Sequence, residues 1–153
     1  MDELPGLDYT YGARGSGPVR LPPARQERNP MPATPIVRDI ADVAVQPVDG
    51  CPGVTMQVLL GADDQMPNFY TRLFTMAPGG HIRGHRHDII EHEQVVLEGE
   101  IVLTLDGVET TARAGQTVYI PAGVAHAYDN RGEVPARFLC AIPRGEYQTE
   151  WTE

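Results

Sequence analysis

Residues 79–99, which read GGHIRGHRHDIIEHEQVVLEG, contain four of the chain's five histidines. His85 and His87 are two residues apart, so a β-strand through them would place both imidazoles on one face of a sheet. That arrangement suits two ligands of a single metal ion. His92 follows after a gap of four residues, which is long enough for the chain to turn a corner and enter the next strand. The stretch therefore indicates a metal site carried by β-strands.

A second stretch, residues 115–130, reads GQTVYIPAGVAHAYDN and supplies the fifth histidine, His126. Together the two stretches resemble the paired motifs of the cupin superfamily, G(X)5HXH(X)3-4E(X)6G and G(X)5PXG(X)2H(X)3N. The second motif matches at every fixed position, and the first matches at all but one, where His92 stands in place of the family's glutamate. Glu91 also falls within the permitted gap after His87, but only His92 satisfies both that gap and the six-residue gap before Gly99.

The resemblance implies one divalent metal ion per chain, held by four histidines: His85, His87, His92 and His126. Imidazole suits zinc, copper, iron and nickel, and the resemblance adds manganese. We expect manganese or iron first, with zinc, nickel and copper as alternatives. His81 lies off the motif, and we expect it at the rim of the site.

The composition narrows the class of protein. A length of 153 residues predicts one domain. The net charge of −9 argues against nucleic acid or an anionic membrane as a partner. The sequence has neither an apolar run long enough to span a bilayer nor the basic start of a signal peptide. Two cysteines are too few for a disulfide framework, so we expect a reduced, cytoplasmic setting.

The chain divides into three parts by composition. Residues 1–35 hold half of the chain's 14 prolines and predict an extended Pro/Gly-rich N-terminal segment. Residues 36–145 show short β-strand patterns throughout, and residues 146–153 are set apart as a C-terminal tail. Strands are predicted at residues 36–40, 54–60, 69–76, 94–97, 100–105, 108–113, 117–120, 125–128 and 136–142, with a hairpin turn at Asp106-Gly107. With the cupin motifs, this pattern predicts an all-β double-stranded β-helix, the small jelly-roll barrel.

The alternation along two strands nominates a pocket lining. Arg72 shares a strand face with Phe74, and Phe138 shares one with Cys140 and Ile142. An arginine within an apolar face is costly unless it is paired or placed at a mouth. Arg72 therefore either receives an anionic substrate group or forms a surface ion pair. Cys140 is either a small buried apolar residue or a thiol that a redox metal could oxidise. Arg72, Phe138 and Cys140 are the candidate pocket residues.

A narrower resemblance covers residues 36–145. Arg72-Leu73, Glu91-His92-Glu93 and the run FLCAIP at residues 138–143 look like the small four-histidine monocupins. The chain departs from them by one extra residue between His87 and His92. Members of this group bind manganese or other divalent metals and form dimers, and some support dioxygenase-like oxidative cleavage. The resemblance thus implies a homodimer with a small-molecule ligand or substrate.

Three functions are compatible with this site. The function we expect first is a metal-dependent oxidoreductase of dioxygenase type that acts on a small organic acid or phenolic compound, and the other two are alternatives. The second is a non-redox enzyme, an isomerase, lyase or polyketide-type cyclase, in which the metal holds an enolate. The third is a non-catalytic cupin that binds a small ligand. Four neutral imidazoles would leave the full double positive charge on the metal, so each function would favour anionic ligands.

Overall fold

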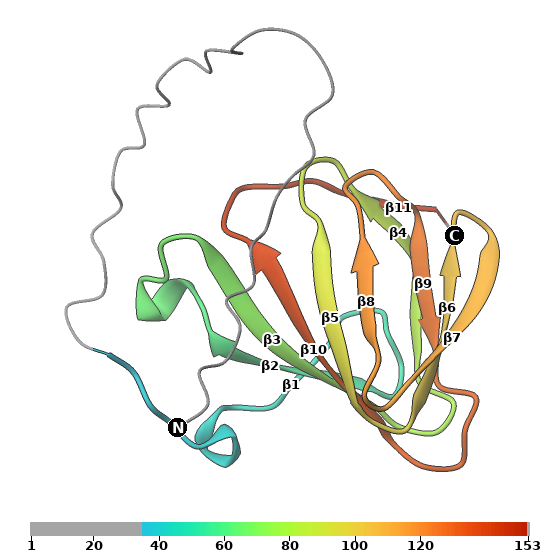
Figure 1. Ribbon diagram of the computed structural model, residues 1–153, viewed down its shortest axis with the longest axis horizontal. Helices are drawn as coiled ribbons and strands as arrows, with labels where there is room; N and C mark the ends of the chain where they lie inside the picture. Colours follow the sequence, from blue (N-terminus) through green and yellow to red (C-terminus); the bar gives the residue numbers. More distant parts are fainter. Residues whose placement is uncertain (1–34, 153) are drawn as a thin grey trace, which may run out of the picture.

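The computed structural model describes residues 35–152, and this part of the chain forms two antiparallel β-sheets that face each other (Figure 1). The six-stranded sheet has the order β1 (Gln46–Pro47), β2 (Val54–Leu60), β3 (Phe69–Met76), β10 (Ala136–Pro143), β5 (His92–Glu98) and β8 (Thr117–Ile120). The five-stranded sheet has the order β11 (Thr149–Trp151), β4 (His81–His87), β9 (His126–Asp129), β6 (Glu100–Leu105) and β7 (Val108–Arg113). The predicted all-β jelly-roll fold is confirmed.

The expectations for residues 1–34 lie outside the described residues. Two 3-10 helices, η1 (Ile40–Asp42) and η2 (Ala62–Asp64), precede strands of the six-stranded sheet. Within the described part of the chain, no helix has the length and apolar character needed to cross a membrane.

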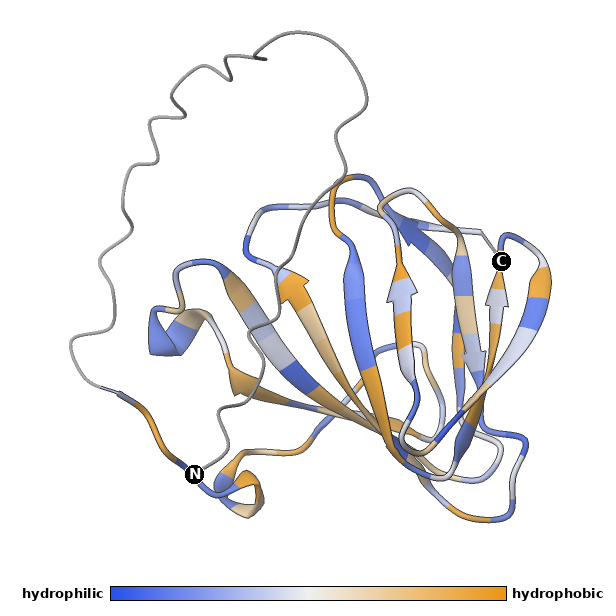
Figure 2. Cartoon of the chain, in the orientation of Figure 1, coloured by the Kyte–Doolittle hydropathy of each residue, from blue (hydrophilic) through white to orange (hydrophobic). Residues whose placement is uncertain are grey.

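Hydrophobic and hydrophilic residues are interspersed along the strands (Figure 2), and in strands such as β5 and β10 buried residues alternate with more exposed ones. In β10, Ala136, Phe138, Cys140 and Ile142 are buried, while the residues between them are partly exposed. The Phe138 ring stacks on Phe74 with the centroids 5.1 Å apart. Because Phe138 is only 1% exposed, its truncation to alanine would cost about 3–5 kcal/mol of stability. The core therefore lies between the inner faces of the two sheets.

Two turns require backbone conformations that favour glycine. Asp106 and Gly107 both have positive φ, 45° and 82°, which matches the two-residue hairpin turn predicted between β6 and β7. Gly99 has φ 68° between β5 and β6, and a side chain there would place its Cβ 2.8 Å from the carbonyl oxygen of Pro135. Gly99 thus serves both the reversal of the chain and its close packing against the residue before β10.

Two of the differences from the predicted strands lie toward the ends of the described chain. The strand predicted at residues 36–40 is absent, and these residues are exposed and irregular up to η1. The Asp39 carboxylate accepts a hydrogen bond from the Ala41 amide at 3.0 Å, so a local cap replaces strand pairing. In the other segment, β11 forms within residues 146–153 and pairs antiparallel with β4. This segment therefore contributes a strand to the barrel.

Replacing Gly99 with alanine is expected to lower the free energy of unfolding by about 2 kcal/mol or more, because positive φ is strained for alanine and its Cβ would meet the Pro135 carbonyl. Gly145→Ala is the matched control, since Gly145 has open space around it and no positive φ. That variant should stay within about 0.5 kcal/mol of the parent. Urea unfolding followed by circular dichroism measures both, and equal stabilities would contradict the role given to Gly99.

Candidate metal centre

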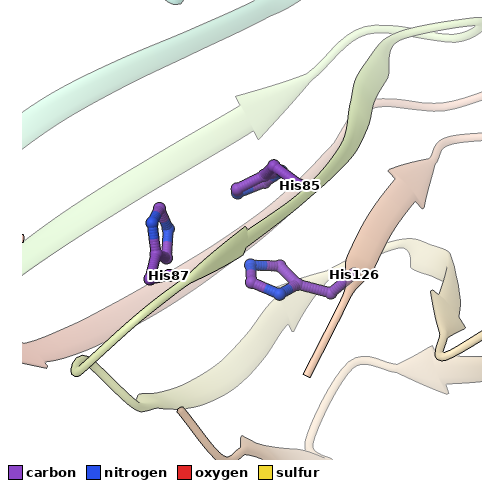
Figure 3. Close-up of side chains that lie close together, drawn as sticks. All are labelled: His85, His87 and His126. Atoms are coloured by element: carbon purple, nitrogen blue, oxygen red, sulfur yellow. The ribbon is translucent and has the colours of Figure 1, made fainter. Parts of the chain in front are cut away.

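Three histidines converge from two neighbouring strands of the five-stranded sheet (Figure 3). His85 and His87 lie on β4, and His126 begins β9. His85 and His126 are direct cross-strand partners, which brings their imidazoles within 4.3 Å, centroid to centroid. One nitrogen from each of the three side chains lies within 4.8 Å of the others. The structure therefore contains a buried histidine cluster that could bind a metal ion.

His92 approaches this cluster from the opposite sheet. It begins β5, and its ring centroid lies 4.8 Å from that of His126 and 5.1 Å from that of His87. It does not belong to the group of three whose ligand atoms lie within 4.8 Å of one another. Glu91 points elsewhere, because its carboxylate accepts a 2.6 Å hydrogen bond from the exposed Tyr119 hydroxyl. Of the two competing residues, His92 is the one beside the other histidines.

Two of the imidazoles are fixed by backbone carbonyls. The Nδ1 atom of His85 lies 2.7 Å from the Arg83 carbonyl oxygen, and that of His126 lies 2.8 Å from the Val124 carbonyl oxygen. A carbonyl oxygen only accepts hydrogen bonds, so both Nδ1 atoms carry the proton and donate it. The other ring nitrogen, Nε2, then has its lone pair free for a metal ion.

The other two imidazoles are held by side chains. The Nδ1 atom of His87 lies 3.1 Å from the Thr149 hydroxyl, and that of His92 lies 3.4 Å from the Cys140 sulfur. All four histidines therefore use Nδ1 for a partner within the protein. Such outer contacts orient the ring and raise the basicity of the nitrogen that binds a metal.

The Nε2 atoms of His92 and His126 are buried and have no hydrogen-bond partner among the described residues. A buried polar atom without a partner costs about 1–3 kcal/mol. Two such atoms, beside two further imidazoles anchored through Nδ1, match the donor set of a metal ion that accepts neutral nitrogen ligands. On this observation the site fits a divalent metal.

Burial also sets the charge of these histidines. It lowers the pKa of His87 and of His126 to about 4 and that of His92 to about 2, and it lowers the pKa of His85. Nearby positive charges lower these pKa values further, Arg72 among them for His85, His87 and His92. The imidazoles are therefore neutral at pH 7, which is the state that metal binding requires.

Comparison with known proteins identifies the barrel. The family described as Cupin domain matches residues 72–142. The barrel has the cupin fold. Polyketide synthase protein TcmJ of Streptomyces glaucescens is 30% identical over 67 residues, which cover 44% of this chain and 45% of TcmJ. SchB of Streptomyces halstedii is 37% identical over 83 residues, which cover 50% of this chain and 60% of SchB. The chain thus spans less than two thirds of the length of either relative.

Two solved structures show the same fold. The polyketide cyclase RemF of Streptomyces resistomycificus superposes with a TM-score of 0.74 at 26% identity, over 78% of this chain and 87% of RemF. A sugar phosphate isomerase of the cupin superfamily from Silicibacter pomeroyi superposes with a TM-score of 0.66 at 23% identity, over 75% of this chain and 80% of that protein.

A cavity of about 210 Å³ is lined by four of the histidines, His85, His87, His92 and His126. The three pocket residues nominated from strand phase, Arg72, Phe138 and Cys140, all contribute to its wall. Among the described residues, no aspartate or glutamate lines the cavity, so none of these carboxylates stands beside Arg72 there. Both cysteines are buried, and neither forms a disulfide. His81 lies apart from the cavity, half-buried, with its Nδ1 atom 2.8 Å from the Asp129 carboxylate.

Several residues that line the cavity were not predicted from the sequence. Gln94 and Tyr128 line the inner wall, and Tyr147, Thr149 and Trp151 close one side from β11 and the loop before it. The position of Gln94 in the cavity could have been predicted, because it lies two residues beyond His92 and so shares its strand face. Residues 147–151 had none, since a three-residue strand with exposed side chains has no hydrophobic period.

The competition between His92 and Glu91 can be tested by metal affinity. We expect His92→Ala to weaken metal binding about ten-fold or more, because it removes an imidazole from the cluster. Glu91→Ala should leave the affinity unchanged, because Glu91 bonds the exposed Tyr119 instead. Competition titrations with a chromophoric chelator, run with zinc and with manganese, measure both. If Glu91→Ala lost the metal and His92→Ala did not, the assignment of His92 would be wrong.

Proposed function

We propose that this cupin is a metal-dependent, non-redox enzyme that cyclises or isomerises a small enolisable compound of polyketide type. The observation that carries the proposal is the set of four neutral, Nδ1-anchored histidines in a cavity whose described wall contains an arginine and no carboxylate. The names of similar proteins support the reaction class: RemF is a polyketide cyclase, and TcmJ is a polyketide synthase protein.

His85, His87, His92 and His126 would hold the metal, and neutral ligands leave its charge undiminished. A bound divalent ion would act as a Lewis acid that stabilises negative charge on a substrate oxygen. Which metal serves is open to test. Because the proposed chemistry needs no change of oxidation state, zinc suffices for it, as do manganese and iron.

The remaining lining residues bind the substrate and exclude water. Phe74, Phe138 and Tyr128 form a run of stacked rings, with centroids 5.1 and 5.5 Å apart, which suits a flat, unsaturated ligand. Burial raises the pKa of Tyr128, so this hydroxyl keeps its proton. Since no carboxylate of the described residues lines the cavity to act as a base, the site favours compounds acidic enough to enter as enolates.

The dioxygenase function expected from the sequence is the second enzymatic candidate. The similar proteins described above are named for cyclisation, isomerisation and polyketide synthesis, and so they favour the non-redox alternative. A non-catalytic, ligand-binding cupin is the third candidate. A requirement for oxygen distinguishes the dioxygenase from the non-redox enzyme. Turnover of a substrate distinguishes both enzymes from the ligand-binding cupin.

We expect the full chain, reconstituted with zinc, to convert a synthetic aryl poly-β-ketone to its cyclised product without oxygen. Zinc cannot change its oxidation state, so activity under argon isolates Lewis-acid chemistry. Product formation is followed by chromatography and oxygen uptake by an electrode. Turnover that required oxygen together with iron or manganese would replace this function with the dioxygenase. Binding without turnover under every condition would leave a ligand-binding module.

We also propose that the protein forms a homodimer through the outer face of the six-stranded sheet. Large apolar side chains are exposed on that sheet, among them Val95 and Leu97 of β5 and Tyr119 of β8, at 39%, 41% and 57%. Adjacent exposed apolar side chains are a common mark of an interface.

The dimer makes a prediction for mass in solution. Sedimentation at micromolar concentration should give twice the chain mass, and Val95→Glu should reduce it to the chain mass because the charge would be buried between subunits. Val108→Glu places the same change on an exposed residue of the other sheet and should leave the dimer intact. A parent protein with the mass of one chain would contradict the dimer.

A further inference from the structure

Three polar residues form one row across the inner face of the six-stranded sheet. Arg72 on β3 and Gln94 on β5 are both cross-strand partners of Cys140, which lies on β10 between them. Directly paired residues in a sheet point to the same face, and all three line the cavity. The row is therefore a polar band in an otherwise largely apolar wall.

The ends of these side chains meet at one atom. The Arg72 Nη2 atom lies 3.4 Å and the Gln94 Nε2 atom 3.7 Å from the Cys140 sulfur. The guanidinium and the amide therefore stand within reach of a single small ligand. His92 contacts the same sulfur at 3.4 Å through Nδ1, which places the row directly beside the metal centre.

Among the described residues, the Arg72 guanidinium has no anionic partner. Its Nε atom is buried without a hydrogen-bond partner, and no described carboxylate forms an ion pair with it. It contacts the Cys140 sulfur, which accepts hydrogen bonds weakly, and its guanidinium carbon lies 5.3 Å from the centre of the Phe74 ring. A guanidinium in this position is costly unless an anion completes it.

Gln94 contributes a second buried polar atom that lacks a hydrogen-bond partner among the described residues. The residue is 3% exposed, and its Nε2 atom donates to the Tyr128 hydroxyl at 2.8 Å. Its Oε1 atom is buried and has no partner among the described residues. A hydroxyl group on a ligand would satisfy this amide.

The rows of residues on either side of the polar row indicate which further chemical groups a ligand needs. One row consists of Phe74, Phe138 and Val96, which are paired across the same three strands, so it is wholly apolar. On the other side lies His92, two residues before Gln94 on the same face of β5. A ligand held at the polar row would place apolar or aromatic surface on the first side and a reacting oxygen near the histidines on the other.

We infer that Arg72 and Gln94 form the substrate-recognition site, which takes an aromatic or enolised ring bearing an anionic oxygen and a separate hydroxyl group. The anionic oxygen accepts hydrogen bonds from Arg72, and the hydroxyl pairs with the Gln94 amide. This inference rests on the proposed function and gives its substrate class: acidic phenols, enols and hydroxyaryl acids rather than sugars or neutral ketones.

Binding of 3-hydroxybenzoate and of benzoate tests the assignment. The chain has a single tryptophan, Trp151, which lines the cavity, so its fluorescence reports a ligand in the metal-loaded full chain. The variants are Arg72→Gln, Arg72→Lys and Gln94→Leu. Arg137→Gln is the matched control, because Arg137 lies on the same strand as Cys140 but pairs with Glu98 on the exposed side, at 2.7 Å. Metal content and circular dichroism verify that each variant is folded.

Arg72→Gln should weaken binding of both probes about ten- to a hundred-fold, as expected for a lost charge-assisted hydrogen bond. Arg72→Lys keeps the charge and should lose much less. Gln94→Leu should weaken 3-hydroxybenzoate about five- to ten-fold and leave benzoate unchanged, because only the first probe has a hydroxyl. Arg137→Gln should alter neither affinity by more than about two-fold.

Unchanged affinity in folded, metal-loaded Arg72→Gln would overturn the inference, as would equal losses for both probes in Gln94→Leu. Such a result would leave the proposed cyclase or isomerase function standing, because that function is tested separately by turnover of the poly-β-ketone. Conversely, normal recognition of 3-hydroxybenzoate without any turnover would refute the enzymatic proposal and leave the recognition site in place.

Discussion

The cross-strand pairing of β4 with β9 is the constraint on which the site depends. It sets His85 directly opposite His126, and backbone carbonyls then fix the rotation of both rings. The strand period adds His87 to the same face, and the opposing sheet brings His92 to meet them. Buried nitrogens without partners cost stability, so the barrel must supply that free energy from its apolar core or recover it from a ligand.

The cavity and the outer surface have opposite electrostatic character. The chain as a whole carries a net charge of −9, yet the cavity wall formed by the described residues includes Arg72 and no acidic side chain. A net negative charge of this size disfavours association with other polyanions. Inside, where water is scarce, a positive charge attracts a small anion strongly. Under the proposed recognition by Arg72, selection among small molecules would take place within the barrel.

The features that depend on local pattern could be predicted from the sequence. The period of two places His85 and His87 on one face, and the same period nominates Arg72 and Cys140 as residues of the pocket wall. Local pattern could not predict partners that pairing alone brings together, such as the contact of His92 with the Cys140 sulfur. Nor could it predict β11, because a three-residue strand without a hydrophobic period carries no local signal.

Strand β11 lies at the edge of its sheet and pairs there with β4 alone. Through Thr149 it reaches the imidazole of His87, and through Trp151 it stacks under the guanidinium of Arg83 at 4.1 Å. A short edge strand opens more readily than the core strands of a sheet. We therefore expect the lifetime of a bound metal or ligand to follow the fraying of these three residues rather than the global unfolding of the barrel.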